Sequence, residues 1–122
     1  SSHGPNYDAA SVAKAMDTIR AEMPVDSAAA HGLIVDCSHG NSGKDEHRQA
    51  QVVRDIAGRI AKGEQGITGI MMESFIEGGN QKAAPLGQLV YGKSITDKCL
   101  SWNTTEQLLR ELAHAVAVRR WK

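Results

Sequence analysis

Three predicted strands of this chain end in side chains that can bind a metal ion or transfer a proton. The first ends near His39, the second ends at Glu73 and the third ends near Asp97. The carboxyl ends of parallel strands lie on one face of an α/β fold, where active sites are built, so these side chains can converge. One imidazole and two carboxylates form a plausible ligand set for a divalent ion such as Mn, Fe, Co or Zn.

Each of these residues also has a structural interpretation. A single histidine at a strand end is more often a hydrogen-bonded structural residue than a metal ligand. A single glutamate or aspartate there is often a helix cap or a loop anchor. The spacing alone therefore leaves a metal site, an acid–base site and a purely structural role open, although the occurrence of all three residues on one predicted face favours a site.

The elements that would position these residues alternate between helix and strand. We expect helices over 8–23, about 44–62 and the last part of the chain, and strands over 31–37, 65–74 and 94–100, the last weaker, with a long loop over 75–93. Pro24 and Gly63 end the first two helices, and Asn103, Thr104 or Thr105 can cap the last. This alternation predicts parallel βα units.

Two of the predicted helices carry apolar stripes that should face the sheet. The stripes consist of Val52, Val53, Ile56 and Ile60 in the second helix, and Leu108, Leu109, Leu112, Ala115 and Val116 in the last.

Length and composition exclude several classes of protein. The 122 residues are enough for one domain or part of one, and the 14 basic and 14 acidic residues balance, so a polybasic nucleic-acid surface is not expected. The apolar runs are far shorter than the roughly 18 residues that a membrane span needs. Without a secretory signal before the first helix, we expect a cytoplasmic protein. Cys37 and Cys99 are then expected to be free thiols.

Four segments resemble one family of enzymes. "GPNYD", "VDCSHGNSGKD", "GIMMESFIEGGNQ" and "YGKSITDKCLSW" are similar, in this order and at similar spacing, to the C-terminal part of class I 3-deoxy-D-arabino-heptulosonate 7-phosphate (DAHP) synthases. The resemblance extends from Gly4 to about Arg120. The segments around His39 and Asp97 are its most specific parts.

The resemblance implies a TIM-type (β/α)8 barrel, with helices outside parallel strands, of about three times this length. Residues 1–122 would then be a single C-terminal half-barrel fragment of about three βα units. Such synthases condense phosphoenolpyruvate with D-erythrose 4-phosphate to give DAHP and phosphate, the first step of the shikimate pathway to aromatic amino acids. They are transferases that perform an aldol-type condensation and require a divalent metal.

The resemblance also implies that His39, Glu73 and Asp97 are metal ligands. In the family the fourth ligand is a cysteine from the first half of the barrel, and Cys37 does not match it. The basic residues that hold both substrates come mainly from that half too, so no catalytic or substrate-binding residue is assigned here. The isolated chain is therefore expected to be inactive.

Two functional hypotheses remain open. The chain is either part of a metal-dependent synthase, or a non-catalytic half-barrel module that self-associates and binds metal weakly or not at all. A different metal-dependent barrel aldolase is disfavoured by the motifs. A cut barrel exposes two strand edges and an apolar inner face, so we expect a homo-oligomer.

Overall fold

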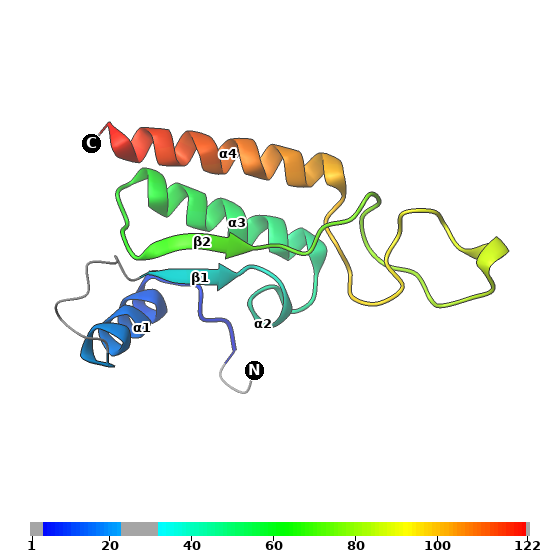
Figure 1. The fold of residues 1–122 in the computed structure, drawn as a ribbon, viewed down its shortest axis with the longest axis horizontal. Helices are drawn as coiled ribbons and strands as arrows, with labels where there is room; N and C mark the ends of the chain where they lie inside the picture. The colour runs from blue at the N-terminus through cyan, green and yellow to red at the C-terminus, as the bar shows by residue number, and fades with distance from the viewer. Residues whose placement is uncertain (1–3, 23–31, 122) are drawn as a thin grey trace.

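The computed structural model describes residues 4–22 and 32–121 as helices, two strands and an ordered loop. The elements in chain order are α1 (Ala9–Glu22), β1 (Leu33–Asp36), α2 (His39–Ser42), α3 (Glu46–Ala61), β2 (Ile67–Met71), the short 3-10 helix η1 (Leu86–Gln88) and α4 (Trp102–Arg120) (Figure 1). The prediction that Pro24 ends the first helix lies outside the described residues.

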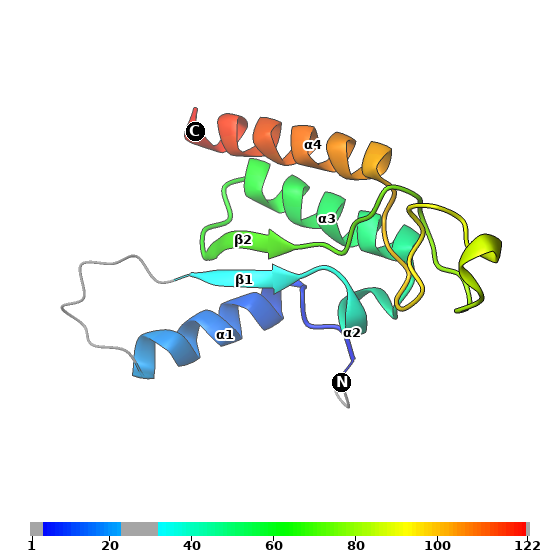
Figure 2. The same ribbon diagram turned by 45° about the vertical axis from the view of Figure 1, so that its right-hand side comes forward.

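The sheet of the described chain consists of β1 and β2, which pair in parallel. Because α3 connects them, the two strands and this helix form one βαβ unit. Figures 1 and 2 show α3 beside β2 and α4 on the far side of α3, whereas α1 lies beside β1. The predicted class, an α/β fold with parallel strands, is confirmed.

The core lies between the sheet and α3. The apolar stripe predicted for this helix is buried, with exposed fractions from 0% at Val53 and Ile56 to 5% at Ile60. These side chains pack with Val35 of β1 and Ile67 of β2 in one cluster. The strands and α3 are therefore held together by the residues that the periodicity selected.

The stripe predicted for the last helix is only partly correct. Leu108 and Ala115 are buried, and Leu112 and Val116 are partly buried against the core. Leu109 is 47% exposed, so it lies outside the contact. The last helix, α4, packs mainly against α3. This contact covers a narrower band of the α4 surface than the predicted stripe.

The prediction of a third strand over 94–100 is wrong. This segment forms isolated bridges instead, in which Leu100 pairs with Ser74, Cys99 with Gly79 and Ser94 with Asn80. The Ser94 hydroxyl accepts a hydrogen bond from the Thr96 amide, a local turn that competes with strand pairing. The described residues therefore comprise two βα units and a preceding helix, rather than about three units.

The N-cap residues of the helices α3 and α4 are an aspartate and a serine. Asp45 caps α3 by accepting from the amides of His47 and Arg48. Ser101 caps α4 by accepting from the Thr104 amide, so the prediction of Asn103, Thr104 or Thr105 as the cap is wrong.

No helix among the described residues is long and apolar enough to cross a membrane. Cys37 and Cys99 are free thiols, as predicted.

Candidate metal centre

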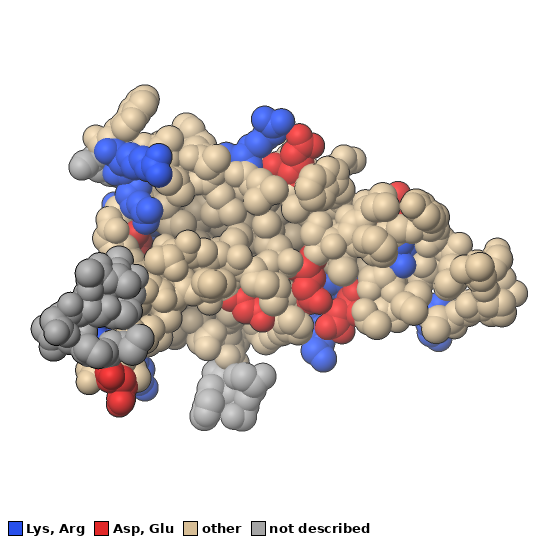
Figure 3. Space-filling model, in the orientation of Figure 1, with Lys and Arg blue, Asp and Glu red and all other residues tan. Residues whose placement is uncertain are grey.

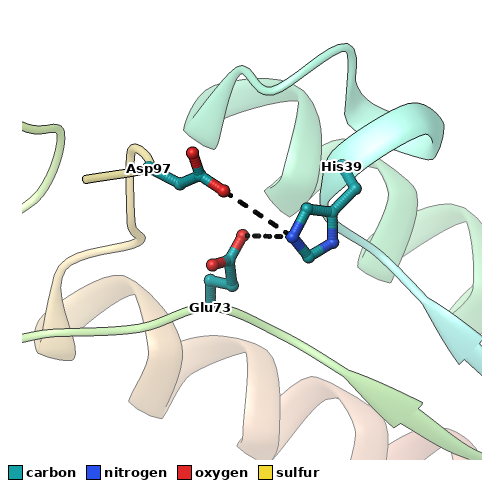
Figure 4. A group of neighbouring side chains, drawn as sticks. All are labelled: His39, Glu73 and Asp97. Atoms are coloured by element: carbon teal, nitrogen blue, oxygen red, sulfur yellow. Dashed lines mark ion pairs between the residues drawn. The ribbon is translucent and has the colours of Figure 1, made fainter.

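The first candidate ligand follows β1 through a tight turn. The Asp36 carboxylate accepts a hydrogen bond from the Ser38 amide at 2.8 Å, and His39 then opens the single-turn helix α2. The backbone of His39 is left-handed, with φ 48°, which is uncommon for a residue other than glycine. The turn directs the imidazole toward the carboxyl end of β2 (Figure 4).

The three predicted ligands meet at this end of the sheet. His39 Nε2 lies 3.4 Å from Glu73 Oε1 and 3.7 Å from Asp97 Oδ2. One donor atom from each residue lies within 4.8 Å of the others. Figure 4 shows the side chains converging from the segment after β1, the segment after β2 and the loop before α4.

The spacing and chemistry of these donors fit a divalent cation. Ligand atoms about 2.0–2.2 Å from a common zinc-sized ion are separated from one another by roughly 3–4 Å. The observed separations fall in this range or slightly beyond it. A mixed imidazole and carboxylate set suits Mn, Fe, Co or Zn. The side chains are 44% exposed at His39, 27% at Glu73 and 45% at Asp97, so an ion could enter from solvent.

Glu73 is positioned by two buried polar side chains. Its backbone amide donates to Gln49 Oε1 at 2.6 Å, and Gln49, on α3, is 1% exposed. Its carboxylate accepts from the Ser38 hydroxyl at 2.5 Å, and Ser38 is 3% exposed. The crossover helix and the turn after β1 thus fix the backbone and the side chain of Glu73 separately.

Asp97 is positioned by the loop between β2 and α4. The Asn80 side chain donates to the Thr96 carbonyl at 2.8 Å, next to Asp97. The backbones of Gly79 and Cys99 exchange hydrogen bonds at 2.8 and 3.1 Å on the other side of it. The loop 75–101 is therefore an ordered support for the third candidate ligand.

Asp36 is a fourth charged group at this site. Its Oδ2 lies 2.9 Å from Nδ1 of His39, the ring nitrogen that faces away from Glu73 and Asp97. The hydrogen bond to Asp36, followed by the negative charges of Asp36 and Glu73, raises the pKa of His39 above its ordinary value. Three carboxylates around one imidazole make this end of the sheet acidic, and Figure 3 shows acidic side chains gathered there.

Sequence reasoning missed the roles of Asp36 and Gln49. Asp36 belongs to the polar cluster after β1, and a metal-binding histidine usually donates its second ring nitrogen to a carboxylate or carbonyl, which is a usable signal. Gln49 carried no such signal, because a glutamine in an amphipathic helix is usually solvated. Cys37 lies in the core, 0% exposed, and burial raises the pKa of its thiol to about 12.

Comparison with known proteins supports the resemblance seen in the motifs. The sequence model of the DAHP synthetase I family matches residues 2–110. The chain belongs to this family. The identification made from the four motif segments is therefore confirmed.

Curated members of the DAHP synthetase I family are similar along nearly all of the chain. Phospho-2-dehydro-3-deoxyheptonate aldolase from Corynebacterium glutamicum is 46% identical over 124 residues, which cover 96% of this chain and 32% of the relative. The Trp-sensitive aldolase of Escherichia coli K12 is 45% identical over 116 residues, covering 94% of this chain and 32% of the relative. The chain thus spans about a third of the length of these relatives.

A solved structure from the family shows the same arrangement of elements. The phospho-2-dehydro-3-deoxyheptonate aldolase of Francisella tularensis superimposes with a TM-score of 0.84 at 36% sequence identity. The match covers 96% of this chain and 32% of that chain. The α/β fold described above is therefore one that the family uses within a longer protein.

Proposed function

We propose that this chain is the metal-binding, C-terminal part of a barrel enzyme that condenses phosphoenolpyruvate with D-erythrose 4-phosphate to give DAHP and phosphate. The observation that carries the proposal is the convergence of His39, Glu73 and Asp97 in a chain of the DAHP synthetase I family. Membership of the family alone would be compatible with a fragment whose ligands are scattered.

The residues of this chain would hold the cation and set its orientation. Nε2 of His39 and one carboxylate oxygen each from Glu73 and Asp97 would be the ligands. A divalent cation bound there supplies Lewis acidity, which polarises a carbonyl oxygen of the substrate. Gln49 and Ser38 hold Glu73 in place before the ion arrives, which reduces the reorganisation needed on binding.

The site in this chain is incomplete for catalysis. Both substrates carry phosphate, and a phosphate group needs cationic partners. In the described part of the chain, the basic side chain that pairs with Glu73 and Asp97 is His39, and these two carboxylates already surround it. We infer that the fourth ligand and the basic residues come from the two thirds of the relatives that this chain does not match. The isolated chain would then bind metal without turning over substrate.

Complementation tests this proposal. DAHP formation is measured for the chain alone, for the rest of the C. glutamicum relative alone, and for both together with Mn²⁺. We expect product only from the mixture, with loss of product on adding a chelator or on changing His39→Gln. His47→Gln is the matched control, because the His47 side chain is 87% exposed and lies outside the donor cluster.

Two results would contradict the proposal in different ways. Turnover by the chain alone would show that the site is complete. A productive mixture that is unaffected by His39→Gln would show that this histidine is not a ligand.

A non-catalytic, self-associating module is the second candidate function. It is favoured by the two-stranded sheet, in which β1 and β2 pair with each other and leave their outer edges without a regular ladder in the described chain. A chain that forms oligomers but restores no activity in the mixture would support this candidate. For either function we propose a cytoplasmic location, where the aromatic precursors would be made.

A further inference from the structure

We propose that Asp36 is a positioning residue that holds His39 in the one tautomer able to bind a metal through Nε2. The inference rests on the proposed metal site, but it concerns a residue outside the ligand set. It also makes a statement about the protein without metal, so it can be tested separately from metal binding.

The geometry assigns a different task to each oxygen of Asp36. Oδ2 lies 2.9 Å from Nδ1 of His39, and Oδ1 accepts from the Ser38 amide at 2.8 Å. The Asp36 carbonyl accepts from the Asn41 side chain, also at 2.8 Å. The carboxylate therefore has little freedom to rotate, and its orientation fixes the plane of the imidazole.

The chemistry of the pair determines the proton position. An ionised carboxylate only accepts hydrogen bonds, so the 2.9 Å contact with Oδ2 places the proton of a neutral His39 on Nδ1. The carboxylates of Glu73 and Asp97 lie farther from Nε2, at 3.4 and 3.7 Å, and compete less well for this proton. Nε2 is then left with its lone pair, and this atom is the one that faces Glu73 and Asp97. A metal ion needs that lone pair, because a protonated ring nitrogen cannot coordinate.

Asp36 also holds the backbone that carries the ring. His39 has a left-handed backbone, a conformation that persists where neighbouring contacts fix it. The hydrogen bond from the Ser38 amide to Oδ1 stabilises the turn directly before this residue. One side chain thus determines both the position of the imidazole and its tautomer.

The substitution Asp36→Asn separates a structural role from the positioning role. Asparagine keeps one oxygen, which can still accept from the Ser38 amide and maintain the turn. Its NH2 group then faces Nδ1 and can only donate to it, which moves the ring proton to Nε2. A residue that served only the turn would tolerate this change, whereas a positioning residue would not.

Two measurements on the 122-residue chain test the proposal. The first is the pair of ring ¹⁵N chemical shifts of His39 without metal, in buffer alkaline enough to keep the imidazole neutral, with His39→Gln used to assign the signal. The second is titration with Co²⁺, followed by its visible absorption. Asp45→Asn is the matched control, because it removes the same charge, and asparagine remains a good helix cap.

We expect the Nδ1–H tautomer in the wild type and in Asp45→Asn, and the Nε2–H tautomer in Asp36→Asn. Loss of such a hydrogen bond typically weakens metal binding by about 10–100-fold, and we expect this reduction in Co²⁺ affinity for Asp36→Asn only. An Nε2–H tautomer in the wild type, or an Asp36→Asn protein that binds Co²⁺ as tightly as the wild type, would overturn the proposal. A correct tautomer switch in a chain that binds no Co²⁺ would support the role of Asp36 and count against the proposed metal site.

Discussion

At the scale of single residues, the candidate site depends on polar side chains that are buried next to it. Gln49 and Ser38 are almost inaccessible to solvent, and each makes a short hydrogen bond to Glu73. Buried polar groups are costly when they lose a partner, so these two contacts limit where the Glu73 carboxylate can lie. The Glu73 donor is therefore ordered by the fold before any ion is present.

The substitution Gln49→Leu should disturb both the fold and the site. The volume is largely conserved, but the Glu73 amide loses its acceptor, which should lower the free energy of unfolding by about 1–3 kcal/mol. Urea unfolding monitored by circular dichroism measures this change. Gln51→Leu, on the exposed side of the same helix, should change stability by less than about 0.5 kcal/mol. Equal effects of the two substitutions would show that the contact to Glu73 is unimportant.

At the scale of secondary-structure elements, most positions of the long helices and strands could be predicted from the sequence. The convergence of His39 and Glu73 follows from parallel pairing, because the carboxyl ends of β1 and β2 must lie side by side. The apolar period of α3 was equally informative, because its buried side chains share one core cluster with Val35 of β1 and Ile67 of β2. Strand pairing and the buried face of a helix both follow from the regular backbone geometry of strands and helices. The spacing of apolar residues in the sequence reflects this geometry.

Features that depend on local side-chain hydrogen bonds could not be predicted. The segment 94–100 has strand-like composition, but the Ser94 hydroxyl accepts a hydrogen bond from the Thr96 amide. This local turn replaces regular pairing with a neighbouring strand. Ser101 caps α4, rather than Asn103, Thr104 or Thr105. The sequence could not identify the cap, because several adjacent residues have side chains that can cap a helix. Asp97 nevertheless reaches the other donors, because the ordered loop carries it there without a strand.

The cap of α3 should make stability depend on pH. Hydrogen bonds from the His47 and Arg48 amides lower the pKa of Asp45 below its ordinary value. A group whose folded pKa is depressed stabilises the protein above its unfolded pKa, about 3.9 for aspartate, and this contribution is lost as the pH falls through the folded pKa. Asp45→Ala should therefore be less stable than the wild type at neutral pH, and the difference should shrink in acid.

Thermal melting of the two proteins across the acid range measures this difference. Asp45→Asn is the control, because an uncharged cap does not titrate, so this variant should lose less stability on acidification than the wild type does. A gap between the alanine variant and the wild type that stays constant with pH would contradict the assignment.

At the scale of the whole molecule, the described chain leaves apolar surface uncovered. Ile34 on β1 is 73% exposed and lies on the face of the sheet opposite Val35, which packs in the core. A cavity of about 580 Å³ lies between β2 and α4, with Ile67, Ile70 and Leu112 in its lining. Ile34 lies on β1, and the cavity lies beside β2. The outer edges of these two strands have no regular strand partner among the described residues.

We therefore predict that the isolated chain self-associates, because exposed strand edges and apolar faces recruit other chains. Sedimentation velocity at micromolar concentration should show oligomers, and Ile34→Lys should shift the population toward monomer. Leu109→Lys is the matched control on the outer surface of α4, where the wild-type leucine is 47% exposed, and it should leave the distribution unchanged. A monodisperse monomer of the wild-type chain would refute the prediction.

The donors of the candidate site come from three segments that are widely separated along the chain. An ion bound to all of them would therefore act as a removable cross-link, which closes two long loops at once. The unfolded polypeptide cannot hold the three groups together, so the energy of coordination would favour the native state by mass action. In such a molecule, the metal content of the surroundings would help to determine how much of the protein is folded.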